Sequence, residues 1–564
     1  ITTAALSVTG TSISAINYLV KTNGAIISVP AITVPGYILL DDSCLGCATR
    51  TSTPTAAANG AAITITGALS AGSFAGSTGV TINAVANGSG VGFTQGALAI
   101  SSLAGGVTIT VNGQTGTGYS SSGAITATNQ AITITTTTTS TGSGIYDTGA
   151  ITGGAVTLTS NKTSATATLV HIAATGLITA NSLTVTSSGG LSTTLVSLGI
   201  ITINAGGGNI AVTANNVAAG GNTGIYQVGA ITNNAVGSNI SFITNGKINQ
   251  TGAIALVANT GGTPANITYD TTSGNLNSTI TSGALTIAAG TNASGINYIA
   301  KSAGAQINPG TIGSSTVALP GYVLLDNTFG CTGTACTPAT GFINTVANNL
   351  SLATTTTGVL VNGAIYTAGN ITVNGVTATT GYGIDYSVVM NSKANVTLNG
   401  ATTSGYGVFN STASTVTGNN ITITGASTAA ATWDVYINSL TINSGTVGSN
   451  IIVTGNVTGI PGAAGGIFLV GGTITGVSGT NITLISNNDI YQNNTISLAA
   501  NISGVAANVL FDTTSGNNLS KVTGGTLTVA TGSTSAINYI IKTNGANITT
   551  PVVTVPGYIL LDNT

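Results

Sequence analysis

The sequence predicts an all-β protein, a right-handed parallel β-solenoid (β-helix) with coils of about 25–31 residues in superrepeats of about 240–280 residues. The observations behind this prediction are the composition, a short repeat and a long repeat. Only 3% of the residues are charged, 42% are hydrophobic and 80 are glycine, and all ten acidic residues are aspartate. Helix surfaces rely on Glu, Lys, Arg and Gln, whereas the Thr, Ser, Asn, Val and Ile that fill this chain favour strands and turns.

The same composition argues against several classes of protein. A mean hydropathy of +0.47 and a net charge of −2 are the reverse of the pattern of a disordered chain. The longest apolar runs, such as residues 558–561, are far shorter than the roughly 20 residues of a membrane helix, so we expect no transmembrane segment. Seven lysines and Arg50 are scattered along the chain, which leaves no basic stripe for nucleic acid.

The short repeat appears where asparagine introduces a strand of alternating apolar and hydroxyl residues. These turn and ladder asparagines are spaced by 25, 25, 30, 31 and 27 residues: Asn370, Asn395, Asn420, Asn450, Asn481 and Asn508. A unit of this size cannot bury its own core, so it must stack on its neighbours, with Ile, Val and Leu inside and Thr, Ser and Asn outside. Another strand of the coil often begins with Gly-Ile-aromatic, as at residues 144–146 and 466–468. Immunoglobulin-like modules, the main alternative, would repeat near 100 residues.

The long repeat consists of two phrases that recur together. Ile-Asn-Tyr begins at Ile16, Ile296 and Ile537, and each copy is followed by a Pro-Gly-Tyr phrase. We therefore divide the chain into superrepeat 1 (1–279), superrepeat 2 (280–521) and the start of a third (522–564). Because 522–564 repeats 1–42, and because the chain begins at Ile1 without a signal peptide, we expect an excerpt of a longer chain or end-to-end joining of copies.

These repeats consist of Thr-rich strands separated by Asn and Gly. In this composition they resemble the repeats of filamentous-haemagglutinin-like exoproteins and large autotransporter passengers. The resemblance covers nearly the whole chain but includes no diagnostic motif. It implies a β-solenoid that serves as a surface adhesin or fibre.

The four cysteines form two local pairs, Cys44 with Cys47 and Cys331 with Cys336. About ten coils separate the pairs, so they cannot share a zinc ion. We expect local disulfides that close protruding loops, which fits an oxidising compartment.

No catalytic constellation is predicted. The single histidine, His171, lies in an apolar run without an assembled nucleophile or acid, and we interpret it as an accommodated strand residue rather than a base. Asp41 and Asp42 are the only adjacent carboxylates, and neighbours on a strand point to opposite faces. We expect no enzyme activity, no metal site and no cofactor.

Six of the charged residues belong to the long repeat: Lys21 with Asp41, Lys301 with Asp326, and Lys542 with Asp562. We expect each lysine to approach the aspartate of its own block and to fix a non-coil insertion; solvated loop ends are the alternative. Asn-x-Ser/Thr triplets offer glycosylation acceptors, although a turn asparagine before a strand creates the triplet automatically: Asn161, Asn239, Asn266, Asn292, Asn370, Asn395, Asn420, Asn481 and Asn547.

These observations favour a non-enzymatic structural protein, located outside the cell or on its surface, which forms the rigid shaft of a filament. Its partners would be copies of itself. Two alternatives remain: an adhesin that binds a receptor or glycan through insertions near residues 41–60 and 326–345, and a β-helix carbohydrate-active enzyme.

Overall fold

The computed structural model describes residues 1–564 except 9–14, 23, 44–61, 73, 75, 86–89, 115, 139–141, 163–169, 191–193, 216–222, 228, 275–276, 329–356, 378–380, 429–431 and 457–464. The described residues form strands and turns and contain no α-helix. They divide into two compact units, residues 1–260 (unit 1) and 261–564 (unit 2). The three superrepeats are a division of the sequence and stay a prediction.

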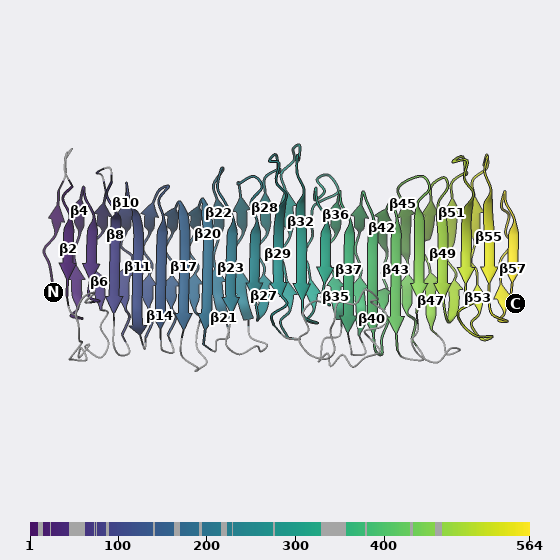
Figure 1. Ribbon diagram of the computed structural model, residues 1–564, viewed down its shortest axis with the longest axis horizontal. Coiled ribbons are helices and arrows are strands. Elements are labelled where there is room, and N and C mark those ends of the chain that lie inside the picture. Colours follow the sequence, from purple (N-terminus) through teal and green to yellow (C-terminus); the bar gives the residue numbers. More distant parts are fainter. Residues whose placement is uncertain are drawn as a thin grey trace. The chain divides into compact units, whose positions relative to one another are not determined.

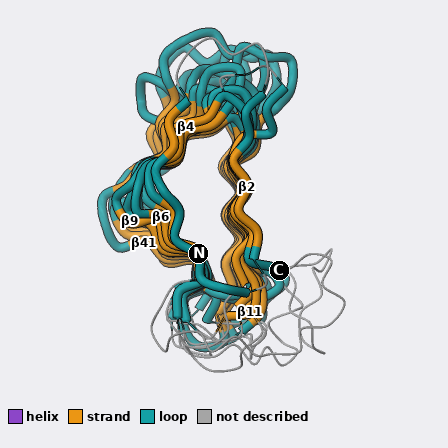
Figure 2. Tube along the Cα trace, turned by 90° about the vertical axis from the view of Figure 1, so that its left-hand side faces the viewer, coloured by secondary structure: helices purple, strands orange, loops and turns teal. Residues whose placement is uncertain are grey.

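Each unit is a parallel β-solenoid, which confirms the predicted fold class. A coil contributes one strand to each of three sheets, called here the first, second and third sheet in the order in which the coil passes through them. Strands of one sheet pair in parallel with the strands one coil away (Figure 1). Viewed along the stack, successive strands such as β6 and β9 lie behind one another (Figure 2). Handedness stays a prediction.

The strands of unit 1 follow sheet by sheet. The first sheet contains β2 (Tyr18–Lys21), β5 (Ile38–Asp41), β8 (Gly79–Val85), β11 (Gly106–Gln114), β14 (Ile132–Thr138), β17 (Ala155–Lys162), β20 (Ser182–Gly189), β23 (Ile210–Asn215) and β26 (Ile240–Thr244). The second contains β3 (Ile27–Val29), β6 (Ile63–Ile65), β9 (Phe93–Gly96), β12 (Tyr119–Ser121), β15 (Ile145–Asp147), β18 (Ile172–Ala174), β21 (Thr194–Leu198), β24 (Thr223–Gln227) and β27 (Lys247–Gln250). The third contains β1 (Leu6–Ser7), β4 (Ile32–Val34), β7 (Leu69–Ala71), β10 (Ile100–Ser102), β13 (Ile125–Ala127), β16 (Ile151–Gly153), β19 (Ile178–Ala180), β22 (Ile201–Ile203), β25 (Ile231–Asn233) and β28 (Ile254–Leu256).

Unit 2 repeats this plan. Its first sheet contains β29 (Ala265–Thr271), β32 (Ile296–Ser302), β34 (Val323–Asp326), β37 (Ile371–Thr377), β40 (Val396–Thr402), β43 (Ile421–Ser427), β46 (Asn450–Gly455), β49 (Asn481–Ser486), β52 (Ala507–Asp512), β55 (Ile537–Lys542) and β57 (Ile559–Asp562). Its second contains β30 (Ile280–Thr281), β33 (Ile307–Asn308), β35 (Thr357–Val361), β38 (Tyr382–Tyr386), β41 (Val408–Asn410), β44 (Val435–Asn438), β47 (Gly466–Val470), β50 (Asp489–Gln492), β53 (Val522–Thr523) and β56 (Ile548–Thr549). Its third contains β31 (Leu285–Ile287), β36 (Ile365–Thr367), β39 (Met390–Ser392), β42 (Ser414–Gly418), β45 (Leu440–Ser444), β48 (Thr473–Gly476), β51 (Thr495–Leu498) and β54 (Leu527–Val529).

The core of each unit is a set of aliphatic columns. Val107, Ile132, Val156, Leu183 and Ile210 occupy one register position in successive strands of the first sheet, and all are buried. Strict alternation puts every second side chain inside, so the core continues from coil to coil without a break.

Hydroxyl residues were predicted to face outward, but some of them are buried where the first sheet meets the second sheet. Thr136, Ser160 and Ser187 occupy one register position near the ends of β14, β17 and β20, and they are buried. The hydroxyl column faces the start of the second sheet, where a Cβ on Gly144 would lie 1.9 Å from the Ser160 hydroxyl. The glycine at the start of this Gly-Ile-aromatic phrase is therefore required by a close approach between the first sheet and the second sheet.

Candidate functional site: polar ladders and an aromatic stack

The lysines and aspartates of the long repeat stack on neighbouring strands. Lys301 in β32 lies in register between Asp270 in β29 and Asp326 in β34. Lys542 lies in the same way between Asp512 in β52 and Asp562 in β57. In unit 1, Lys21 is in register with Asp41. Strand neighbours in register are about 4.8 Å apart, so the backbones of each lysine and of its aspartate are adjacent, and an ion pair between the two side chains stays a prediction. Both residues lie on strands of the solenoid itself.

Each aspartate of these columns also accepts hydrogen bonds from a residue that follows the end of its strand. The Asp326 Oδ1 atom accepts hydrogen bonds from the Thr328 backbone N–H, at 2.8 Å, and from the Thr328 hydroxyl, at 2.5 Å. Asp41, Asp270, Asp512 and Asp562 accept the same pair of bonds from the residue two positions later. At Asp562 these bonds and the charge of Lys542 lower the carboxyl pKa.

The asparagines of the short repeat form a hydrogen-bonded ladder along unit 2. The Asn395 backbone N–H donates to the Asn370 Oδ1 atom at 3.1 Å, and the Asn420 Nδ2 atom donates to Asn395 Oδ1 at 3.0 Å. The pattern continues through the other ladder asparagines and ends at Asn538, whose Nδ2 donates to Asn508 Oδ1 at 2.9 Å; the others are Asn450 and Asn481. Each coil is thus held to the next by side chains as well as by the backbone.

The asparagine of Ile-Asn-Tyr explains why Pro-Gly-Tyr follows it. The Asn297 Oδ1 atom accepts a hydrogen bond of 3.1 Å from the Tyr322 backbone N–H in the next coil. A Cβ on Gly321 would lie 2.3 Å from this oxygen, and the same close approach occurs at Gly36 and Gly557. The two phrases recur together because they pack on each other.

The asparagines predicted as glycosylation acceptors are at turns and strand starts, and several belong to hydrogen-bonded pairs. Asn239 contacts Asn209, and Asn266 accepts a bond from Asn297. Asn292 bonds weakly to the Gly290 carbonyl, and Asn161 accepts a bond of 3.4 Å from Ser188. The Asn547 backbone carbonyl accepts a hydrogen bond from the Val522 backbone N–H. Their glycosylation stays a prediction.

An aromatic stack runs over the outer face of the second sheet in unit 2. Phe409, Tyr436, Phe468 and Tyr491 are in register on β41, β44, β47 and β50, and all are partly exposed. Successive ring centroids are 5.5, 4.9 and 5.2 Å apart, with planes 10–23° from parallel. Three flanking rings join the stack: Tyr382, Tyr406 and Trp433. Of the four stacked residues, Phe468 belongs to a Gly-Ile-aromatic phrase, and the stack was not predicted from the sequence.

His171 lies inside the solenoid beside the hydroxyl column. Its Nδ1 atom is 2.9 Å from the Ser187 hydroxyl, and both side chains are fully buried. Burial, with the nearby charge of Lys162, lowers the pKa of His171 to about 4. Lys162 is also buried; its Nζ atom donates to the Gly142 carbonyl at 3.0 Å, and burial lowers its pKa to about 8. The imidazole is neutral at pH 7, and the geometry favours a packing role.

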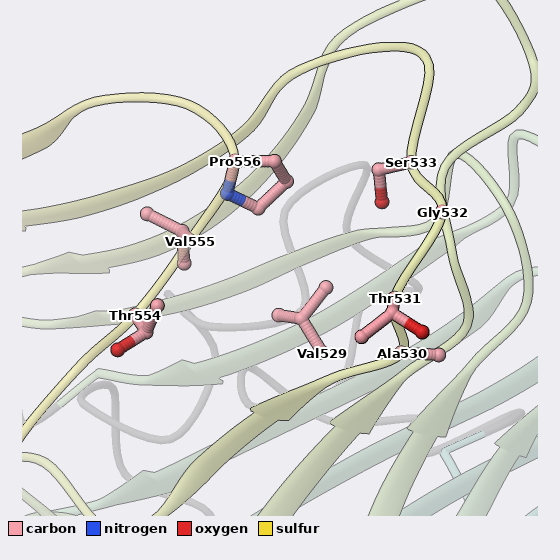
Figure 3. A pocket seen from close by; sticks show the side chains of 8 residues that line it. All are labelled: Val529, Ala530, Thr531, Gly532, Ser533, Thr554, Val555 and Pro556. Atoms are coloured by element: carbon pink, nitrogen blue, oxygen red, sulfur yellow. The ribbon is translucent and has the colours of Figure 1, made fainter.

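Other chemistry-bearing groups stay isolated in the described part of the chain. No cluster of three or more His, Cys, Asp or Glu side chains occurs there that could hold a metal ion. The four cysteines lie outside the described residues. A pocket of about 340 Å³ between the loop after β54 and the loop before β57 is lined by eight uncharged residues, among them Val529, Ser533 and Pro556 (Figure 3).

Comparison with known proteins gives no relative: no family model, curated protein or solved structure matches the chain. In the described residues no helix is long and apolar enough to cross a membrane.

Proposed function

We propose that this protein is a non-enzymatic structural protein that forms the rigid shaft of an extracellular filament or cell-surface fibre, as the resemblance to filamentous-haemagglutinin-like exoproteins implies. The observation that carries the proposal is the continuous coupling of one coil to the next. Aliphatic columns, asparagine bonds and Lys–Asp columns act along the direction of stacking in each unit. A structure held together in this way resists bending and local opening.

The surface chemistry supports the same role. Lysine and arginine are scarce, so trypsin-like proteases find few cleavage sites, and hydroxyl and amide groups respond little to salt. Copies of the chain are the proposed partners. Negative-stain imaging of the native material tests the proposal: uniform filaments are expected, and isolated globular particles on the cell surface would refute it.

A surface adhesin is the second candidate, and the aromatic stack favours it. Partly exposed aromatic rings are common where proteins bind sugars or other proteins. The predicted binding insertions lie for the most part outside the described residues, which include only 41–43 and 326–328 of them. A glycan array probed with the intact chain separates the candidates, because a shaft protein binds no glycan selectively and an adhesin does.

A further inference from the structure

The outer face of the first sheet in unit 1 carries a two-dimensional array of threonines. Strands β11, β14, β17 and β20 each present threonine at two successive outward positions, and β23 adds one more. The first rank contains Thr108, Thr133, Thr157 and Thr184, and the second contains Thr110, Thr135, Thr159, Thr186 and Thr213; Thr81 on β8 continues the first rank in register, but β8 has Asn83 at the second position and is not counted. These nine residues are called here the threonine array.

The register of the sheet fixes the spacing of the array. Thr133 pairs with Thr108 and with Thr157, and Thr135 pairs with Thr110 and with Thr159. Neighbours in one rank are therefore about 4.8 Å apart, and the two ranks are about 6.7 Å apart along the strands. Threonine is stiff at χ1, so hydroxyl and methyl groups can repeat with the same period as the backbone.

The array is open to solvent and electrically neutral. Its side chains are partly or well exposed. The other described outward residues of the five strands, such as Asn112, Thr137 and Ser188, carry no charge either. The face thus offers hydroxyl donors and acceptors and methyl groups in a regular pattern.

A comparison inside the molecule shows that strand propensity alone does not produce this pattern. In the first sheet of unit 2, threonine recurs at several corresponding positions, among them Thr372, Thr397 and Thr422, but both ranks are interrupted, by Asn374, Asn399, Ile452, Ile485 and Leu510. The third sheet of unit 1 carries only one rank of threonines, including Thr152 and Thr179. Two uninterrupted ranks occur on the first sheet of unit 1.

We propose that the threonine array is an ice-binding face. Its two repeats are close to the spacings between water molecules on exposed planes of hexagonal ice, and the hydroxyls can hold ranks of water at those spacings while the methyl groups exclude water between them. A neutral face complements a neutral lattice, because charged groups would impose hydration shells that do not fit the crystal. This function goes beyond the proposed shaft and would belong to its surface.

The test uses the intact chain in buffer that contains growing ice. The wild-type protein is expected to shape single ice crystals and to slow ice recrystallisation. The double variant Thr135→Tyr/Thr159→Tyr places two large side chains in the centre of the array, and it is expected to raise the protein concentration needed to slow recrystallisation by about tenfold or more. The matched control, Thr152→Tyr/Thr179→Tyr on neighbouring coils of the third sheet, is expected to keep wild-type activity.

A gentler variant covers the case in which tyrosine disturbs the fold. Thr135→Ser/Thr159→Ser removes only two methyl groups, and it is expected to weaken the ice activity while the circular dichroism spectrum stays that of the wild type. A wild-type chain without any effect on ice would overturn the proposal. An array variant with full ice activity would also overturn the proposal. A variant that keeps its ice activity but loses self-association in sedimentation experiments would do the same, since the face would then bind a second copy.

Discussion

Substitution of Gly321 by alanine tests whether the two phrases of the long repeat pack as described. The new Cβ would lie 2.2 Å from the Ile296 carbonyl oxygen and 2.3 Å from the Asn297 Oδ1 atom. Overpacking of this kind costs about 1–3 kcal/mol, and loss of the bond from the Tyr322 N–H to Asn297 adds roughly 0.5–1.5 kcal/mol. We expect a local destabilisation of roughly 2–4 kcal/mol, the middle of the summed range.

Hydrogen exchange measures this loss where it occurs, because a solenoid need not unfold in a single step. Backbone amides of β32 and β34 should exchange roughly 30- to 1,000-fold faster, at 1.4 kcal/mol for each factor of ten. Gly262→Ala is the control, because nothing lies within 4 Å of its new Cβ, and it should change stability by less than about 1 kcal/mol. The double variant Asn297→Ala/Gly321→Ala should recover only part of the loss, because the Ile296 carbonyl remains. Unchanged exchange in Gly321→Ala would refute the packing argument.

Three further substitutions test the ladders, the stack and the buried groups. Asn420→Ala removes the hydrogen bonds of 3.0 Å to Asn395 and 2.9 Å from the Asn450 N–H. The free energy of unfolding measured with urea should therefore fall by about 1–2 kcal/mol. Asn391→Ala, at an outward residue outside the ladder, should change it very little. Phe409→Ala removes ring stacking on Tyr382 and Tyr436, whose ring centroids lie 4.0 and 5.5 Å from that of Phe409. The free energy of unfolding should fall by about 1–3 kcal/mol in the same measurement. Tyr146→Ala, on the second sheet of unit 1, should change it little. Because burial lowers the pKa of His171 from 6.5 to about 4, the unfolded chain binds this proton first as the pH falls, so the contribution of His171 to stability should decline between pH 6.5 and 4 by up to roughly 3 kcal/mol. This contribution is measured as the difference in unfolding free energy between the wild type and His171→Asn at each pH, and a difference that does not change with pH would contradict the assigned cause.

The coil, its parallel register and its inward residues could be predicted because they follow from local spacing. Alternation at Ile132–Ile134 and a period of 25–31 residues determine which side chains face inward, and the structure confirms both. The neighbouring positions of Lys301 and Asp326 were also within reach, because the two phrases recur together and each separation, 20 or 25 residues between the lysine and the aspartate, is close to one coil.

The contacts between sheets of one coil could not be predicted in the same way. The inward turn of Ser160 and Ser187 and the burial of Lys162 depend on the angle at which the first sheet meets the second. The sequence marks that angle with recurring glycines, such as Gly144, Gly224 and Gly466, but a glycine does not say which atom approaches it. The aromatic stack was missed for a related reason, since variable coil lengths hide the common register of Phe409, Tyr436 and Phe468.

The two faces of each strand are therefore under different physical constraints. An inward substitution disturbs a column that extends through several coils, so Ile and Val recur there with little variation. An outward substitution leaves the core unchanged, and in this chain the outward positions carry threonine ranks on the first sheet of unit 1 and aromatic rings on the second sheet of unit 2. Because the backbone repeats at a fixed spacing, any outward residue type that is kept over successive coils becomes an array with that spacing. A solenoid can acquire a periodic binding surface by repeating one residue type, without any change in its core.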